Sequence, residues 1–460
     1  MAIGRSRRIR KGAAMLVSMI ILAALSAWAV SVCCVSNVNL QLAENQRKAD
    51  AARASAESGL EVMRFWLGRF SVPGTTDPGQ VFDLLASSFA DDLSSNGVYN
   101  ICPTYDGSTI TVPAVTLDSQ QGRFFTARIR QADAATIELE VTGHCGSISK
   151  TIRVNYNIGE RAHSVFDYGV ATRGALHLSG NVELEGVNVS VESDVFIESA
   201  NSNLALSIIG NSHIAGEVSI ANPLATVDIQ GGQASIGGEK GDDALNHVFI
   251  GVDPPEFPTP NPSAFAAYAT NVIDASTDTS SDATFENVRI AAGTNPTFNG
   301  NVELKGIVFI ETPNVVTFAG NAEVTGIVVG DGNVEDNSAT NQINFLGTVV
   351  SHGVEELQGA QFAGLQDQTG TFLLAPGFHV SFGGNFHTLN GAVAANGIEF
   401  FGNAGGTING SVINYSDVEM TLSGNSDLYF NRSGVTEVPA GFVPEIVLEY
   451  DPSSYCEVTI

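Results

Sequence analysis

The chain has 460 residues, which is enough for two or three domains. Its formal net charge of -28 comes from a shortage of Lys and Arg, because charged residues make up only 15% of the sequence. Such a surface repels the phosphate backbone, so we expect no nucleic-acid partner. The 48 glycines indicate many tight turns.

Basic residues cluster immediately before an apolar segment in the first part of the chain. The first eleven residues contain five of the 21 Lys and Arg residues, and the 23 residues from Ala13 to Val35 carry no formal charge. As a helix this segment would be about 34 Å long, enough to cross the hydrocarbon core. The basic flank predicts a cytoplasmic N-terminus. We therefore predict a single pass through the inner (cytoplasmic) membrane, with the bulk of the chain extracytoplasmic.

A secretory signal peptide is the competing interpretation, because it also joins a basic flank to an apolar segment. Its apolar region is normally shorter, whereas this chain continues without Pro or Gly from Ala13 to Gly59. We therefore predict one extended helix over residues 13–70. Its Ala-rich stretch from Ala49 to Ala56 suits close helix packing.

The segment RRIRKGAAMLVSMIILAALSAWAVSV, with the later ADAARASAESGLE, resembles the N-terminus of a type IV prepilin, in particular the PilX-type minor pilins and related pseudopilins. In that family a prepilin peptidase cuts after the Gly between the basic leader and the apolar helix. The resemblance implies a leader at residues 1–12 and cleavage between Gly12 and Ala13. It also implies contacts between the N-terminal helix and other pilin or pseudopilin subunits.

One position departs from the pattern of major pilins. These carry a Glu at the fifth mature position, which in the family is taken to neutralise the N-terminal amine of a neighbouring subunit within an apolar bundle. The corresponding residue here is Val17. PilX-type proteins and the largest pseudopilins also lack the Glu, so the resemblance implies a minor, initiating or tip-located subunit.

Residues 71–170 carry the pattern of a small α+β neck. A turn-rich stretch and a short helical pattern, VFDLLASSFADDL, precede alternating runs such as ATIELEVTG, which are typical of half-buried antiparallel strands. Cys102 and Cys145 lie in this block, and in an oxidising compartment we predict a disulfide between them. The alternatives are two free buried thiols or pairing of either with Cys456. Cys33 and Cys34 are interpreted as small residues of the apolar segment.

From residue 171 the sequence becomes repetitive. SGNVELEGVNVSVE, NGNVELKGIVFIET and AGNAEVTGIVVGDG share one pattern, in which Gly-Asn is followed by a second Gly six residues after the first. Several spacings are near twenty residues, which matches one rung of a β-solenoid, with Gly-Asn supplying positive φ at each corner. We therefore predict a mainly β chain with a β-solenoid-like domain at 171–440 and a C-terminal tail at 441–460. The alternative is an irregular β-sandwich.

A proline-rich insertion at 253–275 interrupts the repeats. Its prolines exclude regular structure, and the residues from Ser263 to Ile273 predict a short helix. We interpret the insertion as a segment that covers or caps the solenoid. A proline-rich ligand for a partner is the alternative.

The repeats do not carry the residues that catalysis needs. Only five basic residues lie between Thr172 and Ala440, and the His residues, such as His177, His213 and His387, are scattered singly. Acidic residues gather at Glu239, Asp242 and Asp243 and at Asp331, Glu335 and Asp336. The second group begins like a calcium loop, but Asp336 replaces the required Gly and Gln342 the required Glu. We predict no catalytic residue, metal or cofactor.

Two functions are consistent with this sequence. The first is a structural minor pilin or pseudopilin-like subunit, not an enzyme, that presents the solenoid for filament assembly, secretion or adhesion. The second is a membrane-tethered β-helix that binds or cleaves carbohydrate, such as a surface glycan. A line of exposed aromatic residues would favour the second, but for the candidates Phe382, Phe386, Phe400 and Phe401 stacking in the core is the favoured interpretation.

Overall fold

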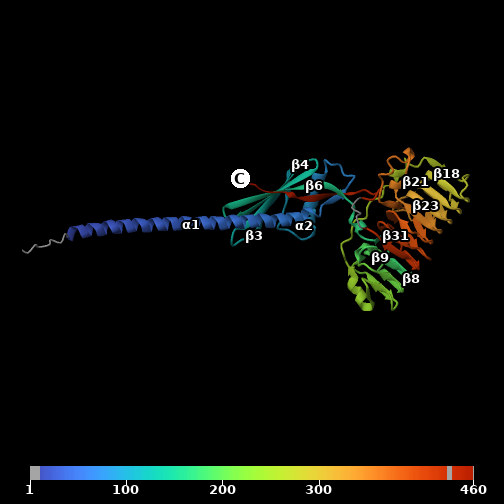
Figure 1. Ribbon diagram of the computed structural model, residues 1–460, viewed down its shortest axis with the longest axis horizontal. Helices are drawn as coiled ribbons and strands as arrows, with labels where there is room; N and C mark the ends of the chain where they lie inside the picture. The colour runs from blue at the N-terminus through green and yellow to red at the C-terminus, as the bar shows by residue number, and fades with distance from the viewer. Residues whose placement is uncertain (1–10, 433–437, 459–460) are drawn as a thin grey trace, which may run out of the picture. The chain divides into compact units, whose positions relative to one another are not determined.

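The structure is a computed structural model that describes residues 11–432 and 438–458, with burial described from residue 14 onward (Figure 1). The chain forms two compact units. The sheet unit contains the chain up to Val72, Thr76–Gly159 and the chain from Ile446 onward. The solenoid unit contains Pro73–Thr75 and Glu160–Glu445.

Helix α1 (Lys11–Leu67) confirms the predicted extended helix. Only its C-terminal half packs within the sheet unit, through a face of buried residues at helical spacing: Ala52, Ala56, Leu60, Met63 and Leu67. Small side chains allow a close approach to the sheet. A Cβ on Gly143 would overlap the backbone of Ala52 and Ala56, and a Cβ on Gly59 would lie 2.6 Å from the ring of Phe125. The Ala-rich stretch therefore packs on the sheet of the same chain.

The sheet has seven strands in the order β1-β35-β6-β5-β4-β3-β2, with antiparallel pairing from β2 to β6. These are β1 (Ser71–Pro73), β2 (Thr104–Tyr105), β3 (Thr109–Asp118), β4 (Arg123–Asp133), β5 (Thr136–Cys145), β6 (Ile148–Arg161) and β35 (Glu445–Val458). Helix α2 (Val81–Ser95) adds buried residues such as Leu85 and Phe89 to the same core.

Strand β35 corrects two predicted boundaries. The predicted tail at 441–460 instead supplies a strand between β1 and β6, and Ile446 and Leu448 are buried in the core of the sheet unit. The predicted neck at 71–170 ends at Gly159. Alternation alone does not reveal which distant segment completes a sheet, so the sequence did not join residues 446–458 to it. The solenoid is therefore an insertion between β6 and β35.

The solenoid unit confirms the predicted β-solenoid, since its rungs stack as three parallel sheets. The first sheet contains β7 (Val170–Thr172), β10 (Val195–Ile197), β13 (Val218–Ile220), β17 (Val248–Ile250), β18 (Asn271–Ile273), β19 (Ala283–Ile290), β21 (Val302–Glu311), β23 (Ala322–Asp331), β25 (Val349–His352), β26 (Thr371–Ala375), β29 (Ala392–Ala395) and β32 (Val412–Asn414).

The second sheet contains β8 (Leu176–Gly180), β11 (Leu204–Gly210), β14 (Thr226–Gln230), β20 (Thr297–Phe298), β22 (Val315–Phe318), β24 (Gln342–Phe345), β27 (His379–Phe382), β30 (Ile398–Phe400) and β33 (Met420–Gly424). The third contains β9 (Glu183–Gly186), β12 (His213–Ile214), β15 (Ser235–Ile236), β16 (Glu239–Lys240), β28 (Thr388–Leu389), β31 (Gly406–Ile408) and β34 (Asp427–Phe430), and only its β15–β16 pair is antiparallel among the described pairs. Short 3₁₀ turns connect some strands: η1 (Ser164–Asp167), η2 (Ser190–Ser193), η3 (Gly241–His247), η4 (Pro262–Phe265), η5 (Val354–Glu356) and η6 (Ala360–Phe362).

The rungs do not stack in the order of the sequence. In the first sheet the order is β17-β13-β10-β7-β32-β29-β26-β23-β21-β19-β18, so the first rung lies in the middle and pairs with the last. The same pairing occurs between β8 and β33 and between β9 and β34. The chain therefore winds from the middle to one end, crosses to the other end after β17, and winds back to the middle.

The crossover is the predicted proline-rich insertion. It lies over the outer face of the first sheet, because Phe257 and Phe265 share a buried cluster with outward-facing residues of that sheet such as Phe196 and Ile413. Tyr415 Oη donates to the Pro258 carbonyl at 2.7 Å, and Arg289 donates to the Ala266 carbonyl at 2.7 Å. The insertion therefore covers the solenoid, as predicted.

The predicted helix from Ser263 to Ile273 is wrong. That segment contains only η4 and then β18, which pairs with β19. The reason is tertiary: the chain has just reached the far end of the solenoid, where the open edge of β19 offers backbone partners.

Phenylalanine rings form the centre of the solenoid core. Phe298, Phe318, Phe345, Phe382 and Phe400 stack face to face on successive rungs, with ring centroids 4.9 to 5.1 Å apart. Phe382, Phe386 and Phe400 are fully buried, which confirms the interpretation of these candidates as core residues, and Phe401 is half-buried.

The Gly-Asn repeats form corners of the rungs, although not all in the same way. Gly180 and Gly210 have positive φ, as predicted, and Asn211 Nδ2 donates to Asn181 Oδ1 at 3.1 Å, so the asparagines form a ladder. Gly320 does not have a positive φ; it is needed because a Cβ there would overlap the backbone of Gly300 in the rung below. The twenty-residue period is exact between β21 and β23, where Val302 pairs with Ala322 and Glu311 with Asp331.

The predicted disulfide is not formed, because Cys102, Cys145 and Cys456 are free thiols. Cys102 precedes β2 and Cys145 ends β5, and two strands lie between β2 and β5. Three strand spacings amount to about 14 Å, well beyond the Cα separation of about 7 Å that a disulfide allows. Strand β6 likewise separates Cys145 from Cys456.

Gly143→Ala should destabilise the sheet unit by about 1–3 kcal/mol, because its Cβ would force α1 away from β5. Trp66 packs against this core, so its fluorescence during chemical denaturation measures the effect. Gly79→Ala is the control, since its Cβ would meet only the Asp77 carboxylate, at 3.3 Å. Equal stabilities of the two variants would contradict the close approach of the helix.

Leu448→Ala should lower the free energy of unfolding of the sheet unit by about 2–5 kcal/mol, because Leu448 is buried in its core. The neighbouring Glu449 is exposed, so Glu449→Ala should change it by less than about 0.5 kcal/mol. The same Trp66 denaturation curve compares them. If both variants match the parent protein, β35 is a dispensable tail.

Candidate functional site

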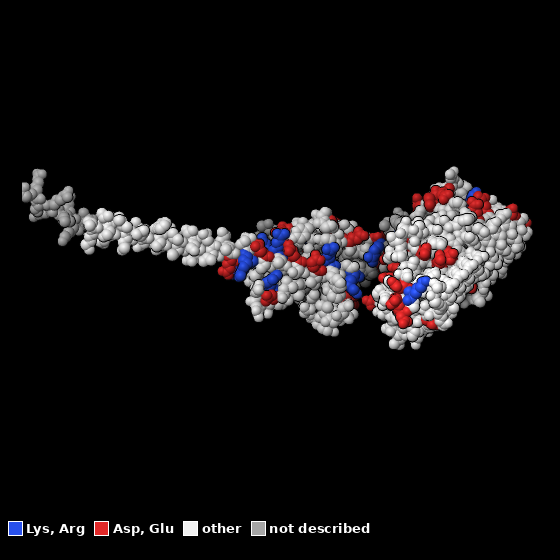
Figure 2. All heavy atoms as spheres, turned by 60° about the horizontal axis from the view of Figure 1, so that its bottom comes forward, with Lys and Arg blue, Asp and Glu red and all other residues white. Residues whose placement is uncertain are grey.

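The N-terminal half of α1 is the largest exposed apolar surface among the described residues. Residues 14–47 are all exposed, and no charged residue occurs from Gly12 to Ala43. The apolar side chains face every side of the helix, as Met15, Ile20, Leu25, Trp28, Val35 and Leu42 illustrate. Figure 2 shows this half of the helix without charged side chains, whereas Lys, Arg, Asp and Glu are scattered over the sheet unit. A helix that is apolar all round requires burial in a membrane or among other helices.

The length of this surface matches a membrane anchor. Among the described residues, one helix is long and apolar enough to cross a membrane, and its most apolar window has a mean hydropathy of 2.3 with no residue buried. The first charges appear at Glu44, Arg47 and Lys48, and Glu44 and Lys48 form an ion pair at 2.7 Å one turn apart. Beyond them the helix begins to pack on the sheet at Ala52. The helix therefore changes from an apolar surface to a packed one within about two turns.

The predicted processing residues lie at the beginning of this helix. Gly12 and Ala13 belong to the first turn of α1, and the basic residues Arg5 to Arg10 lie outside the described residues. Val17 is 54% exposed on the apolar surface. Nothing within the described chain covers the position where major pilins carry their Glu.

The calcium-like loop is a structural turn. One carboxylate oxygen of Asp336 accepts the Ser338 amide at 2.9 Å, and the other accepts Asn341 Nδ2 at 3.0 Å. Asp331 ends β23, where partial burial raises the pKa of its carboxyl. Asp331, Glu335 and Asp336 are not among the described residues that bring three ligand atoms together. The other acidic group, Glu239, Asp242 and Asp243, is exposed on β16 and η3.

Charged side chains also line a hollow of about 360 Å³ on the solenoid, formed by Glu286, Lys305, Glu323, His352 and Glu356. Lys305 and His352 each lie beside carboxylates. Lys305 lies 2.7 Å from Glu303, and this hydrogen bond raises the pKa of Lys305 and lowers that of Glu303. His352 lies 3.5 Å from Glu323 and 3.4 Å from Glu356. Carboxylates outnumber Lys305 in this hollow, so its lining is acidic.

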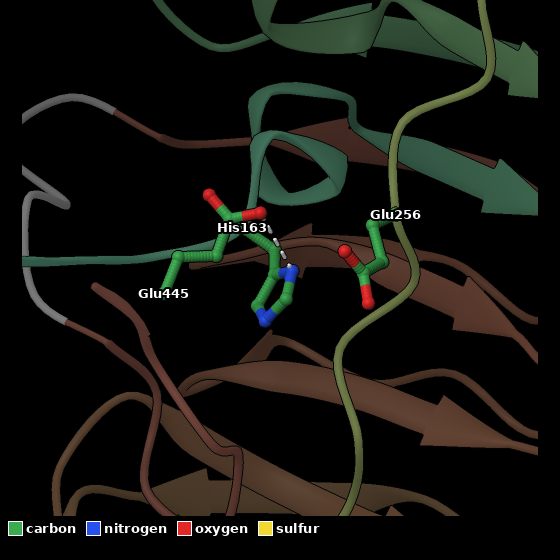
Figure 3. Close-up of side chains that lie close together, drawn as sticks. All are labelled: His163, Glu256 and Glu445. Carbon is green, nitrogen blue, oxygen red and sulfur yellow. Dashed lines mark ion pairs between the residues drawn. The ribbon is translucent and has the colours of Figure 1, made fainter. Parts of the chain in front are cut away.

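Three side chains that the sequence did not single out converge in the solenoid unit: His163, Glu256 and Glu445 (Figure 3). Each has a ligand atom within 4.8 Å of the others, and this is the one such group of His, Cys, Asp and Glu in the described part of the chain. His163 follows β6, Glu256 lies in the crossover, and Glu445 begins β35. Because they are up to 282 residues apart in sequence, no spacing motif could have revealed them.

The single histidines named from the sequence have local partners instead. His213 Nδ1 lies 2.7 Å from the Ser235 hydroxyl on the next rung, and His177 lies 3.9 Å from Glu419. His387 is exposed. None of the three belongs to a group with three potential ligands among the described residues.

No protein-family model matches the sequence. No curated protein matches it either. Among solved structures, the chain aligns with the competence-associated pilin ComZ from Thermus thermophilus, with a TM-score of 0.26 and 11% sequence identity. The alignment covers 89% of this chain and 97% of that chain.

A variant without residues 1–43 should remain in solution without detergent, because it loses the uncharged surface but no buried residue of α1. Size-exclusion chromatography in aqueous buffer measures this. The full chain is the control and should require detergent. The denaturation midpoint reported by Trp66 should be unchanged, and aggregation of the truncated variant would contradict the assignment of the apolar surface to this half of α1.

Proposed function

We propose that this chain is a membrane-anchored, pilin-related structural subunit that carries a large inserted β-solenoid. The observation that supports this most directly is the division of α1 into two halves. One half packs on a small antiparallel sheet, and the other is a fully exposed apolar helix without a charge from Gly12 to Ala43. Such a helix can lie in a membrane and then exchange the lipid for like helices in a filament.

The solenoid topology is consistent with this role. Both connections to the solenoid come from neighbouring strands of the sheet, β6 and β35, and not from α1. A domain of 286 residues, Glu160–Glu445, is thereby added without interrupting the helix that makes the subunit contacts.

Within this proposal the chain is a minor, PilX-type or pseudopilin-like subunit at the initiating or tip position. Val17 supports it, because an apolar side chain at the fifth mature position cannot neutralise the amine of a neighbour. The bulk of the solenoid supports it as well, since a large domain on every subunit is difficult to repeat along a tightly packed filament. The partners are then other pilin or pseudopilin subunits, and the exposed faces of the solenoid serve secretion or adhesion.

The proposal assigns no catalytic activity. The aromatic candidates for a glycan platform are largely in the core. Asp336, in the calcium-like loop, caps a turn. These observations favour a structural role over the carbohydrate-binding or carbohydrate-cleaving alternative.

Processing tests the proposal. In a host with a prepilin peptidase, mass spectrometry should find Ala13 as the first residue of the mature protein, in the inner membrane and with the solenoid extracytoplasmic. Gly12→Val should leave the leader attached, because the peptidase of the family recognises Gly at that position. Gly4→Val changes the leader equally and should be processed normally.

An intact leader on the parent protein, or a cut near Ser36, would overturn the pilin assignment. Quantification of the subunits in filament preparations tests the minor or tip position separately, because a minor or tip subunit must be far less abundant than the major one. If this chain were the most abundant subunit, the tip assignment would fail while the pilin assignment remained.

A further inference from the structure

The cluster of His163, Glu256 and Glu445 joins three segments of the solenoid unit that are distant in sequence. Figure 3 shows their side chains pointing toward one another from the segment after β6, the crossover and the start of β35. His163 is 5% exposed and Glu445 is 6% exposed, whereas Glu256 is exposed. A buried imidazole beside a buried carboxylate must be compensated, because unpaired polar groups are costly inside a protein.

The hydrogen bonding of His163 determines which ring nitrogen is free. Its Nε2 atom lies 3.1 Å from the Val443 carbonyl oxygen, which can only accept, so Nε2 carries a hydrogen. In the neutral ring, Nδ1 then has the lone pair. This Nδ1 is buried and has no hydrogen-bond partner, although Glu445 Oε1 lies only 3.2 Å away.

The geometry of this pair differs from that of a hydrogen bond. A protonated Nδ1 would point its hydrogen at the carboxylate oxygen, but the contact does not meet hydrogen-bond geometry. When two ligand atoms bind one metal ion, their lone pairs point at the ion and not at each other. In a tetrahedral zinc site, bonds of about 2.0–2.2 Å place ligand atoms about 3.4 Å apart, close to the 3.2 Å that separates Nδ1 from Oε1.

We propose that His163 Nδ1, Glu445 Oε1 and a carboxylate oxygen of Glu256 bind a divalent transition-metal ion such as Zn²⁺, with water at the remaining position. Imidazole and carboxylate together suit borderline ions of this class. The ligand atoms already lie within 4.8 Å of one another, and the exposed Glu256 side chain can complete the site by rotation.

The surroundings resemble the outer shell of a metal site. A ligating histidine usually donates its other ring N–H to a carbonyl or carboxylate, as His163 does to Val443. Glu445 Oε2 accepts a hydrogen bond from Arg161 at 3.0 Å, which orients the carboxylate and leaves Oε1 toward His163. Both ligands are therefore positioned by partners that do not occupy the metal-facing atoms.

The ion would cross-link three segments of the solenoid unit. It would link the chain where it leaves β6, where it re-enters β35 and where it crosses the solenoid. These are the segments that the stacking of rungs does not hold, so binding would stabilise the solenoid unit through coupling of metal affinity to folding.

Metal titration of the full chain in detergent micelles tests the site. Cysteines also bind zinc, so the exposed thiols Cys33, Cys34, Cys102 and Cys456 are first alkylated. Isothermal titration with Zn²⁺ should show one site per chain, and Co²⁺ should give the visible absorption of a tetrahedral N/O site. Zn²⁺ should also raise the melting temperature of the solenoid unit.

Glu256→Gln is the decisive variant, because this exposed side chain can be changed without disturbing the core. It should weaken Zn²⁺ binding at least about 10-fold and remove the shift in melting temperature. Asp253→Asn, which removes the same charge three residues away, should bind like the parent protein. His163→Gln should abolish the Co²⁺ spectrum.

The proposal is overturned if the alkylated parent protein binds no Zn²⁺, in which case His163 and Glu445 form only an ion pair. It is equally overturned if Glu256→Gln binds Zn²⁺ as tightly as Asp253→Asn, because the ion would then occupy another site. Far-UV circular dichroism of Glu256→Gln verifies that the comparison is made between folded proteins.

Discussion

The pairing of the first solenoid rung with the last determines the rest of the fold. Strands β7, β8 and β9 hydrogen-bond to β32, β33 and β34, so the two ends of the inserted chain meet in the middle of the stack. This is the arrangement that an insertion requires, because the chain must leave from β6 and return to β35, its neighbour in the sheet. An ordinary solenoid, wound from one end to the other, would place its two ends many rungs apart.

This constraint makes the crossover necessary. Because winding runs in one direction along the stack, the chain must travel once over its full length without adding a rung. The proline-rich segment suits that task, since prolines lack the amide that would otherwise need a partner and favour an extended chain. Phe257 and Phe265 then bury the outer face of the first sheet, so the connection also forms a second core. Tyr415 illustrates the packing: its hydroxyl is bonded to Pro258, and burial raises its pKa.

The sequence predicted the features that depend on local periodicity. The apolar helix, the alternating strands of the small sheet and the twenty-residue rungs follow from patterns within about twenty residues, and so does the burial of Phe382 and Phe400. The errors concern partners that are distant in the chain. No local pattern shows that residues 446–458 form a strand of the seven-stranded sheet, in which order the rungs stack, or that Cys102 and Cys145 lie far apart. The sequence did not indicate the cluster of His163, Glu256 and Glu445 for the same reason, since only the tertiary fold brings these residues together.

The distribution of small side chains shows how one helix can serve two environments. Along the packed half, Ala52, Ala56 and Gly59 bring the helix backbone close to Gly143 and Phe125. Along the other half, large side chains such as Leu22 and Trp28 surround the axis and find no cover within the described chain. The two halves of α1 therefore present different surfaces, one packed on the sheet and the other apolar and exposed. Strands β6 and β35, which lead into and out of the solenoid, are neighbours in the sheet on which the packed half of the helix lies.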